Sequence, residues 1–410
     1  METLVQRCAG LDVHKDTVVA CVRITGKDDV QEHLHTFGTT TAELLALADW
    51  LARWQVNLVA MEATGVYWKP VYYVLEETFG CWLLNARHMH NVPGRKTDMA
   101  DAAWIAQLTA HGLVRPSFVP PKPIRELRNL TRYRKAQIDE RGREAQRLDK
   151  ILQDAGIKLS SVATDILGAS GRAMLLALVQ GTRDPEVLSD LARMSLRKKI
   201  PALREALTGR FSDHHALIVG EILAKLDYLD EAIGRLSDEI NQVIAPFAHE
   251  RDLLITAVGV DRRTAEGLIA EIGVDMSVFG SADRLASWAG RCPGQYESAG
   301  KSRSGRVRKG NKWLTTYLHD AAMAAARSKN TYANAQFHRI KGRRGYHKAI
   351  GALEHSLLVA IYHMIDRDQP YHDLGADYFT RRQDPARRAR KLANELTSLG
   401  YQITAPHPAA

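Results

Sequence analysis

The sequence predicts an α/β domain over residues 1–115, followed by a mainly helical remainder. Three observations predict this division. Short β-rich runs alternate with amphipathic helical stretches up to residue 111, a Pro-rich break follows at Pro116–Pro123, and strand signals are few between that break and residue 290. In a chain of 410 residues we therefore expect a helical connector at 120–250, a C-terminal domain at 251–375 and a basic, partly disordered tail at 376–410.

The N-terminal elements follow the order of a ribonuclease-H-like domain. Residues 7–25 form two β-rich runs around a polar break, which predicts a hairpin, and a third strand is expected near His33–Phe37. A helix over Thr41–Gln55 is predicted by leucines at helical spacing. The order continues as strand, helix, strand and helix, at 56–63, 65–79, 81–87 and 97–111. Three strands followed by alternating helices and strands are typical of that fold class.

Four acidic residues lie within or at the ends of these predicted elements, where a charged side chain needs a partner. Asp12 points to the face opposite its two apolar neighbours, because side chains alternate across a strand. Glu62 ends the strand at 56–63 in the same way, and Asp98 and Asp101 lie one turn apart on the last helix. A divalent cation is the simplest compensation for carboxylates that lie together, and oxygen ligands suit Mg²⁺, with Mn²⁺ as the alternative.

Each acid also has an ordinary interpretation. Asp98 follows Thr97 and can cap the helix, and a lone acid at a strand end usually lies at the surface. Asp101 fits this interpretation less well. It lies on the same side of the predicted helix as Trp104, Ile105 and Leu108, and this apolar side should face the sheet. If the four acids converge, two ions about 4 Å apart would serve phosphodiester cleavage or transfer.

Beside Asp12, His14 and Lys15 are expected at a solvated strand end, with phosphate contact as the alternative.

The helical region carries two patterns that bear on function. Apolar residues alternate spacings of four and three, the heptad signature of a coiled coil, at Ile222, Leu226, Leu229, Ile233, Leu236, Ile240 and Val243. They predict a helical arm or dimer stalk, and an antiparallel pair within one monomer stays open. After Pro246, two helical segments around Gly259 resemble a helix–hairpin–helix, whose backbone N–H groups would contact a phosphate. Asp261 stands where a second glycine is usual, so a plain helical turn is equally open.

The charge of the chain favours an anionic partner, and nucleic acid is the commonest one. The net charge is +9, and Lys and Arg concentrate at 291–312, 338–348 and 381–391. The first cluster is a Gly- and Ser-rich loop, where a serine hydroxyl would stand beside phosphate-binding cations: Lys301, Arg303, Arg306, Arg308, Lys309 and Lys312. The second cluster includes Arg343 and Arg344, and we expect it to bind the nucleic-acid backbone.

Several classes of protein fit the sequence poorly. No apolar run is long enough to cross a bilayer, and the N-terminus has no secretory pattern, so we expect a cytoplasmic protein. The four cysteines are scattered, which argues against disulfides or a zinc site and predicts core thiols. An actin-like kinase shares the expected sheet order but needs Gly-rich phosphate hairpins, and none follows Asp12.

Three strings resemble the DEDD transposases of the insertion-sequence one-ten family: GLDVHKD, MEATG and KTDMADA, in this order. The resemblance resumes at AVGVDRRTAEGLIAEIG and at WAGRCPGQYESAGKSRSGRVRKGNKWL. It implies a RuvC-like catalytic domain, a coiled-coil connector and a C-terminal transposase domain that supplies a nucleophilic serine. It also implies a structured guide (bridge) RNA that pairs with target and donor DNA. By motif, the family's acids fall on Asp12, Glu62, Asp98 and Asp101 and its serine on Ser298, with Ser302 and Ser304 as rivals.

From these residues we expect a Mg²⁺-dependent recombinase with a composite site. Metal ions held by the four acids would position the scissile phosphate, and Ser298 would attack it to form a phosphoserine intermediate. Two alternatives remain: a junction resolvase that uses metal-activated water, and an architectural nucleic-acid-binding protein with a degenerate nuclease fold. A homo-oligomer is expected, a dimer or a tetramer, because recombination must cut and rejoin several strands.

Overall fold

Contacts between residues divide the chain into two units, Met1–Val119 and Pro120–Ala410. The computed structural model describes residues 3–26, 29–63, 65–85, 98–292, 296–298, 300–303, 307–382 and 384–403; for 98–100, 296–298 and 301–303 it describes the backbone alone. Within these ranges, no helix combines the length and the apolar character that crossing a membrane requires.

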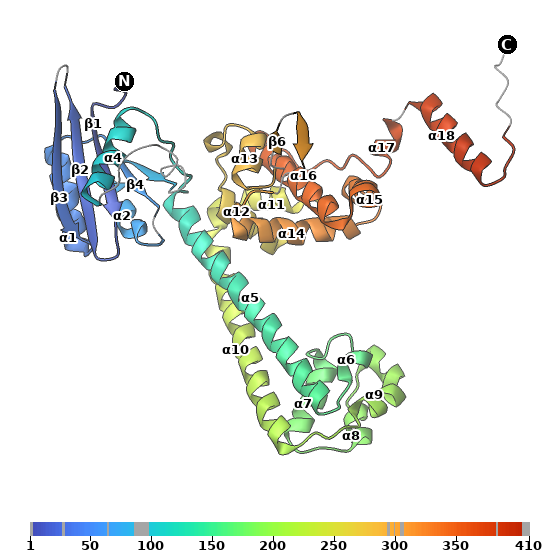
Figure 1. Cartoon of the computed structure of the whole chain (residues 1–410). Helices are drawn as coiled ribbons and strands as arrows, with labels where there is room; N and C mark the ends of the chain where they lie inside the picture. Colours follow the sequence, from blue (N-terminus) through green and yellow to red (C-terminus); the bar gives the residue numbers. More distant parts are fainter. Residues whose placement is uncertain are drawn as a thin grey trace, which may run out of the picture. The chain divides into compact units, whose positions relative to one another are not determined.

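Five strands form one mixed sheet in the first unit (Figure 1). The strand order is β3-β2-β1-β4-β5, in which β1, β2 and β3 pair antiparallel and β4 runs parallel to both β1 and β5. This mixed sheet with its helices confirms the predicted α/β class. The strands are β1 (Arg7–Val13), β2 (Thr17–Thr25), β3 (Val30–Gly38), β4 (Leu58–Glu62) and β5 (Gly80–Leu84).

Helices cover both faces of this sheet. Helices α1 (Thr41–Arg53) and α2 (Trp68–Leu75) bury apolar side chains such as Leu47 and Val71 against one face, together with Leu11 and Met61. Helix α4 (Asp98–Ala110) packs on the other face, where Ala102 and Ala106 meet Cys21 of β2. The small alanines allow this helix to approach the strands closely.

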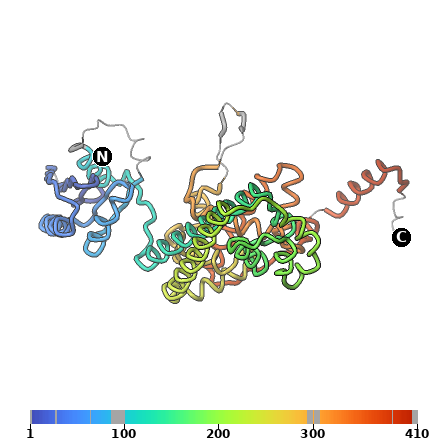
Figure 2. Tube along the Cα trace, turned by 90° about the horizontal axis from the view of Figure 1, so that it is seen from below, coloured from blue at the N-terminus to red at the C-terminus, as the bar shows by residue number. Residues whose placement is uncertain are grey.

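The two longest helices of the second unit lie side by side (Figures 1 and 2). They are α5 (Lys122–Asp154) and α10 (Asp213–Val243), and they run antiparallel: Asp154 bonds His215 at one end, whereas Glu140 pairs with Lys225 farther along. Heptad positions such as Leu226 and Leu229 are buried in this pair. The structure therefore has the antiparallel pair within one chain, and the heptad stretch needs no second chain to be covered.

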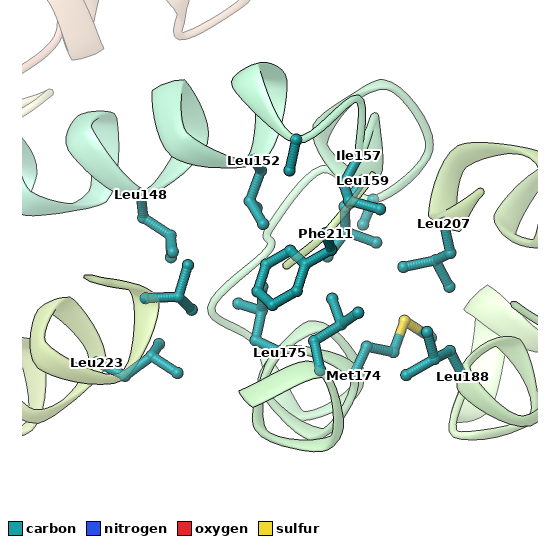
Figure 3. Packing of buried hydrophobic residues seen from close by; sticks show 14 of the residues in the cluster. Leu148, Leu152, Ile157, Leu159, Met174, Leu175, Leu188, Leu207, Phe211 and Leu223 are labelled. Atoms are coloured by element: carbon teal, nitrogen blue, oxygen red, sulfur yellow. The ribbon is translucent and has the colours of Figure 1, made fainter. Parts of the chain in front are cut away.

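A small helical cluster closes the end of this pair and shares an apolar core with it (Figure 3). Leu148 and Leu152 from α5 and Leu223 from α10 pack there against Leu175 and Phe211. The cluster consists of α6 (Leu159–Val162), α7 (Ala169–Val179), α8 (Pro185–Asp190), a 3₁₀ turn at Met194–Lys199 and α9 (Ile200–Leu207).

The remaining helices form a bundle that holds the other end of α5. Its elements are α11 (Ala248–Ile255), α12 (Arg262–Ile272), α13 (Ala282–Trp288), α14 (Lys312–Arg327), α15 (Tyr332–Arg344) and α16 (Tyr346–Arg367), followed by α17 (Tyr378–Arg381) and α18 (Pro385–Ser398). Between α13 and α14, the short strands β6 (Tyr296–Ser298) and β7 (Lys301–Arg303) pair antiparallel, where we predicted only a loop.

Buried ion pairs fix α5 to α12. Glu271 is fully buried and accepts two hydrogen bonds from the Arg132 guanidinium, at 2.7 and 2.8 Å, and one from the Asn311 amide at 2.5 Å. Glu266, also buried, accepts one from Arg134 at 2.6 Å. Each carboxylate has a cationic partner, as a buried charge requires.

Candidate active site

Asp12 lies on the face of β1 that α4 covers. Two residues of the same pleat show this: the Cys8 thiol lies 3.3 Å from the Ala106 carbonyl oxygen, and a β-carbon on Gly10 would stand 2.2 Å from the Ala102 carbonyl oxygen. Because alternate side chains share a face, Asp12 points the same way. Its exposed fraction is 9%, so it is a nearly buried carboxylate.

The start of α4 lies toward Asp12. The contact moves from Ala106 opposite Cys8 to Ala102 opposite Gly10, so α4 runs antiparallel to β1. Asp12, the next residue on this face of β1, therefore lies toward the first turn of α4. That turn carries Asp98 and Asp101, although the Asp98 side chain lies outside the described residues.

Glu62 takes the matching place on the neighbouring strand. Leu11 pairs with Met61 in the parallel register, so Glu62 comes next to Asp12 at the carboxyl ends of both strands. Ala60, two residues earlier, packs against Ile105 of α4, which puts Glu62 on the α4 side as well. Glu62 is half-buried.

Asp101 lies on the sheet-facing stripe of α4. One and two turns later, Ile105 and Leu108 are buried against Ala60, while Asp101 itself is half-buried. Strand register and helix packing thus place Asp12, Glu62 and Asp101 on one side of the sheet, toward the start of one helix. Oxygen ligands, carboxylates among them, are what Mg²⁺ prefers, so the chemistry of these residues fits the predicted ion. Among the described side chains, no three potential ligands lie close enough together to hold a metal ion.

His14 is a neighbour of this site. Its Nε2 lies 3.1 Å from Oδ2 of Asp12, and half of its side chain is exposed, as expected at a solvated strand end. The imidazole therefore contacts one oxygen of the Asp12 carboxylate. Sequence analysis placed His14 beside Asp12 without foreseeing this bond, because it depends on the turn between β1 and β2.

The segment that carries Ser298, residues 290–310, begins and ends at backbone positions that contact each other. A β-carbon on Gly310 would stand 2.0 Å from the Ala289 carbonyl oxygen, and one on Gly290 would stand 2.6 Å from that of Arg308. Between these ends, Ser298 pairs with Lys301 next to the turn of the β6–β7 hairpin, and Ser302 pairs with Glu297. The side chains of Ser298, Lys301, Ser302 and Arg303, together with Ser304 and Arg306 entirely, lie outside the described residues.

The basic residues that follow the hairpin lie at the surface. Arg308 and Lys309 are exposed, and the Lys312 ammonium lies 5.1 Å from the centre of the Trp313 ring at the start of α14. Arg343 and Arg344 are exposed at the end of α15. Their contact with nucleic acid stays a prediction.

Gly259 has a packing role that accounts for a glycine there. Its φ is +86°, and a β-carbon would stand 2.3 Å from the Ala321 carbonyl oxygen of α14. Asp261 caps α12 by accepting a hydrogen bond from the Thr264 amide at 2.8 Å. These features describe a helical turn packed on α14, and phosphate contact at Gly259 stays a prediction.

The sequence analysis did not identify Glu354 as a buried acid with partners. Glu354 is buried on α16 among apolar residues, where its carboxylate bonds Arg291 and His319. The signal that could have found it is a charge inside an apolar stripe, between Leu353 and Leu357.

Comparisons with known proteins found two family matches. A family described as "Transposase" matches residues 9–157, and the "Transposase IS116/IS110/IS902 family" matches residues 251–339. Among solved structures, a Thermus thermophilus RuvC structure is 14% identical, with a TM-score of 0.22, and the match covers 27% of this chain and 99% of that one. No curated protein matched the chain.

Proposed function

Because this chain belongs to the IS116/IS110/IS902 family of transposases, which cleave and transfer DNA, we propose that it is the site-specific recombinase of an insertion sequence. Its substrates would be donor and target DNA. The observation that carries the proposal is the parallel pairing of Leu11 with Met61, because Asp12 and Glu62 follow these residues on the side of the sheet that α4 covers.

The metal-binding residues in this proposal are Asp12, Glu62, Asp98 and Asp101. A bound Mg²⁺ would neutralise charge on the scissile phosphate, and Mn²⁺ could replace it. The chain's own part is to hold the carboxylates on a rigid sheet and helix. An ion at Asp12 would be bound next to His14, whose Nε2 lies 3.1 Å from Oδ2 of that carboxylate.

Ser298 would be the nucleophile. Its hydroxyl oxygen bonds to phosphorus, the bond from phosphorus to one DNA oxygen breaks, and the serine proton ends on that oxygen. The phosphoserine keeps a phosphoester bond that a hydroxyl of another strand can attack, so rejoining needs no outside energy source. The neighbouring cations, from Lys301 to Lys312, would hold the DNA backbone.

Covalent capture of DNA tests this role. The full chain is incubated with Mg²⁺, guide RNA, donor and target DNA, and protein–DNA adducts are resolved under denaturing conditions. Ser298→Ala should give no adduct, whereas the matched controls Ser302→Ala and Ser304→Ala should keep it. Adduct from Ser298→Ala at the wild-type level would assign the attack to another residue, and cleavage by the wild type without any adduct would favour the water-using resolvase.

We also propose that the recombinase binds a structured guide RNA and acts as a dimer or tetramer. The basic segments at 291–312 and 338–348 and the resemblance of the motifs support the RNA. Sequencing of the RNA that copurifies with the chain should find a non-coding end of its own element. Only random cellular RNA in that sample would remove the guide and leave the metal site standing.

A further inference from the structure

We infer that a cavity beside α15 and α16 binds one unpaired nucleobase, with the phosphate of that nucleotide at Arg367. The inference rests on the proposed function, which supplies RNA and DNA as partners. The cavity measures about 630 Å³ and lies wholly within the second unit. Ligand pockets in proteins commonly measure roughly 300–1,000 Å³, so its size suits a base and its sugar.

Two helices and the segment that follows them enclose the cavity. Helices α15 and α16 pack on each other (Figure 1). Tyr332 and Gln336 line the cavity from α15, His355 and His363 line it from α16, and residues of the segment 369–374 form the remaining side. Several of these last residues are exposed, so the cavity opens to the surface.

Contacts outside the cavity fix its walls. The Asp373 carboxylate accepts a hydrogen bond from the backbone N–H of Tyr332 at 3.0 Å, and the backbone N–H of Tyr371 donates to Oγ1 of Thr256 at 2.9 Å. The Tyr332 ring also stacks on Phe379, with ring centres 5.1 Å apart. A wall that is already ordered loses little freedom when a ligand binds, which favours binding.

Three polar atoms of the residues around the cavity have unmet hydrogen-bonding capacity. Oε1 of Gln336 and Nδ1 of both His355 and His363 are buried and have no hydrogen-bond partner in the part of the chain that the structure describes. Gln336 is only 8% exposed, and its Nε2 donates to Oγ of Ser356 at 2.8 Å. Buried polar atoms are normally paired with protein, water or ligand, so three unpaired ones around one cavity indicate a polar ligand.

A nucleobase matches the groups that line the cavity. Its flat ring stacks on aromatic side chains, and its edge carries the donors and acceptors that an amide or an imidazole can bond. Tyr332 and Tyr371 supply aromatic rings, and Gln336 supplies the amide. Among the described residues that line the cavity none is acidic, so none repels the phosphate of a nucleotide. An apolar side chain of a protein partner would leave the polar atoms unpaired.

Basic residues lie where the backbone of the bound strand would run. Arg367 is exposed and lines the cavity, and a guanidinium binds phosphate through two parallel hydrogen bonds. Arg343 follows Gln336 by seven residues, so it lies on the same side of α15, roughly 10 Å along the axis. A strand held by the basic segment 338–348 can therefore place one of its bases in the cavity.

The test measures the gain in affinity that one base provides. Two fluorescent single strands of equal length are compared: one is built wholly from a stable abasic analogue, and the other carries one adenine in the same backbone. Anisotropy titrations with the full chain should show about 5–100-fold tighter binding of the strand with adenine, the effect of one stacked base. The pair is made once as RNA and once as DNA. A larger gain for RNA assigns the base to the guide, and a larger gain for DNA assigns it to donor or target.

Variants locate the base in the cavity. Tyr371→Ala removes a stacking surface, and Ala360→Trp fills the cavity from α16, so each should abolish most of the gain. Tyr371→Phe keeps the ring and should keep the gain. The matched control is Tyr228→Ala, because Tyr228 is 62% exposed on α10 of the same unit and should not affect the gain.

Arg367→Gln should act differently from the cavity variants. It removes a phosphate contact, so it should weaken both strands equally and lower the salt slope of log affinity by about 0.7. The gain from the single adenine should stay at the wild-type value. A selective loss of the adenine gain in this variant would contradict the placement of the phosphate at Arg367.

Photocrosslinking of the wild type keeps the inference open to refutation if a variant fails to fold. A photoreactive thio-base replaces the adenine, and mass spectrometry locates the crosslink. We expect it within Tyr332–Gln336 or the segment 369–374, whereas crosslinks confined to 338–348 would contradict the cavity.

The outcomes separate this inference from the proposed function. Equal affinity of the wild type for the two strands, binding of neither strand, or a gain that survives both Tyr371→Ala and Ala360→Trp would overturn the base-binding cavity. Covalent capture of DNA by the wild type and by Ser298→Ala decides the recombinase separately, because that assay does not depend on the cavity.

Discussion

Gly10 of β1 lies directly against Ala102 of α4: a β-carbon on Gly10 would stand 2.2 Å from the Ala102 carbonyl oxygen and 2.4 Å from the Ala106 nitrogen. Both obstacles are backbone atoms, which cannot rotate aside. Because glycine has no β-carbon, α4 can lie this close to the sheet. The position of Asp101 relative to Asp12 depends on this spacing.

Gly10→Ala should therefore push α4 away from the sheet. We expect a loss of about 1–3 kcal/mol in the free energy of unfolding, as for other overpacked cores, and a larger relative loss of DNA cleavage. Thermal unfolding and a cleavage assay measure the two effects. Gly26→Ala is the matched control, since its nearest neighbour atom would lie at an ordinary 3.4 Å. Unchanged cleavage by Gly10→Ala would mean that the site does not depend on this packing.

Removal of metal should lower stability if the acids converge. On the proposed function, Mg²⁺ would bind the folded site and not the unfolded chain, so it should raise the melting temperature of the wild type, and chelation should reverse the rise. In Asp12→Asn and Glu62→Gln this shift should vanish, and DNA cleavage should fall by at least about 10²-fold. Asp49→Asn, on the exposed side of α1, should behave like the wild type. An equal Mg²⁺ shift in all these variants would place the ion elsewhere.

Loss of the buried Glu271 carboxylate should be costly. Glu271→Ala leaves Arg132 and Asn311 without their acceptor, so we expect a loss of about 3–5 kcal/mol in urea unfolding. Asp230→Asn removes an acid from an ion pair at the surface, with Arg141, and should cost about 1 kcal/mol or less. Equal costs for the two variants would contradict the burial of the Glu271 pair.

The cysteines should differ in reactivity. Burial raises the pKa of the Cys8 thiol to about 11 and those of Cys21 and Cys81 to about 12. At pH 8, roughly one in a thousand of the Cys8 thiols, and fewer of the others, would be the reactive thiolate. Alkylation of the native protein, located by mass spectrometry, should therefore reach the half-buried Cys292 first. Early labelling of Cys8 would show that the sheet opens on that timescale.

His249 should titrate above its ordinary value. Its hydrogen bond to Asp368 raises the pKa of the imidazole from 6.5. The pair then stabilises the fold below pH 6.5, and this contribution disappears as the pH rises through the raised pKa. In an NMR titration, Asp368→Asn should return the midpoint of His249 to the ordinary range. An unchanged midpoint in that variant would remove Asp368 as the cause.

Much of the first unit follows from local patterns. The strand and helix order was predicted, because each element buries one face and its periodicity records that burial. Helix α2 begins at Trp68 and not at Gly65, since the φ of +55° at Gly65 lies outside the helical region. All four cysteines were expected in the core, and Cys8 and Cys21 are buried there, but Cys81 and Cys292 are only half-buried.

The rest could not be predicted, because it depends on contacts between distant residues. The same heptad spacing serves a dimer or an antiparallel pair, and only the contacts of α5 with α10 distinguish them. The β6–β7 hairpin needed a turn at Gly300, whose φ is +72°. His319 and Glu354 are 35 residues apart, so no local pattern joins them.

The paired helices α5 and α10 have one more consequence. The chain leaves α5 at Asp154 and enters α10 at Asp213, and Asp154 still contacts His215 at 3.2 Å. The residues between these points therefore return to where they started, and their apolar core includes residues of both long helices. The cluster is thus joined to the two long helices by one continuous core, so a change inside it would be felt at the ends of both helices.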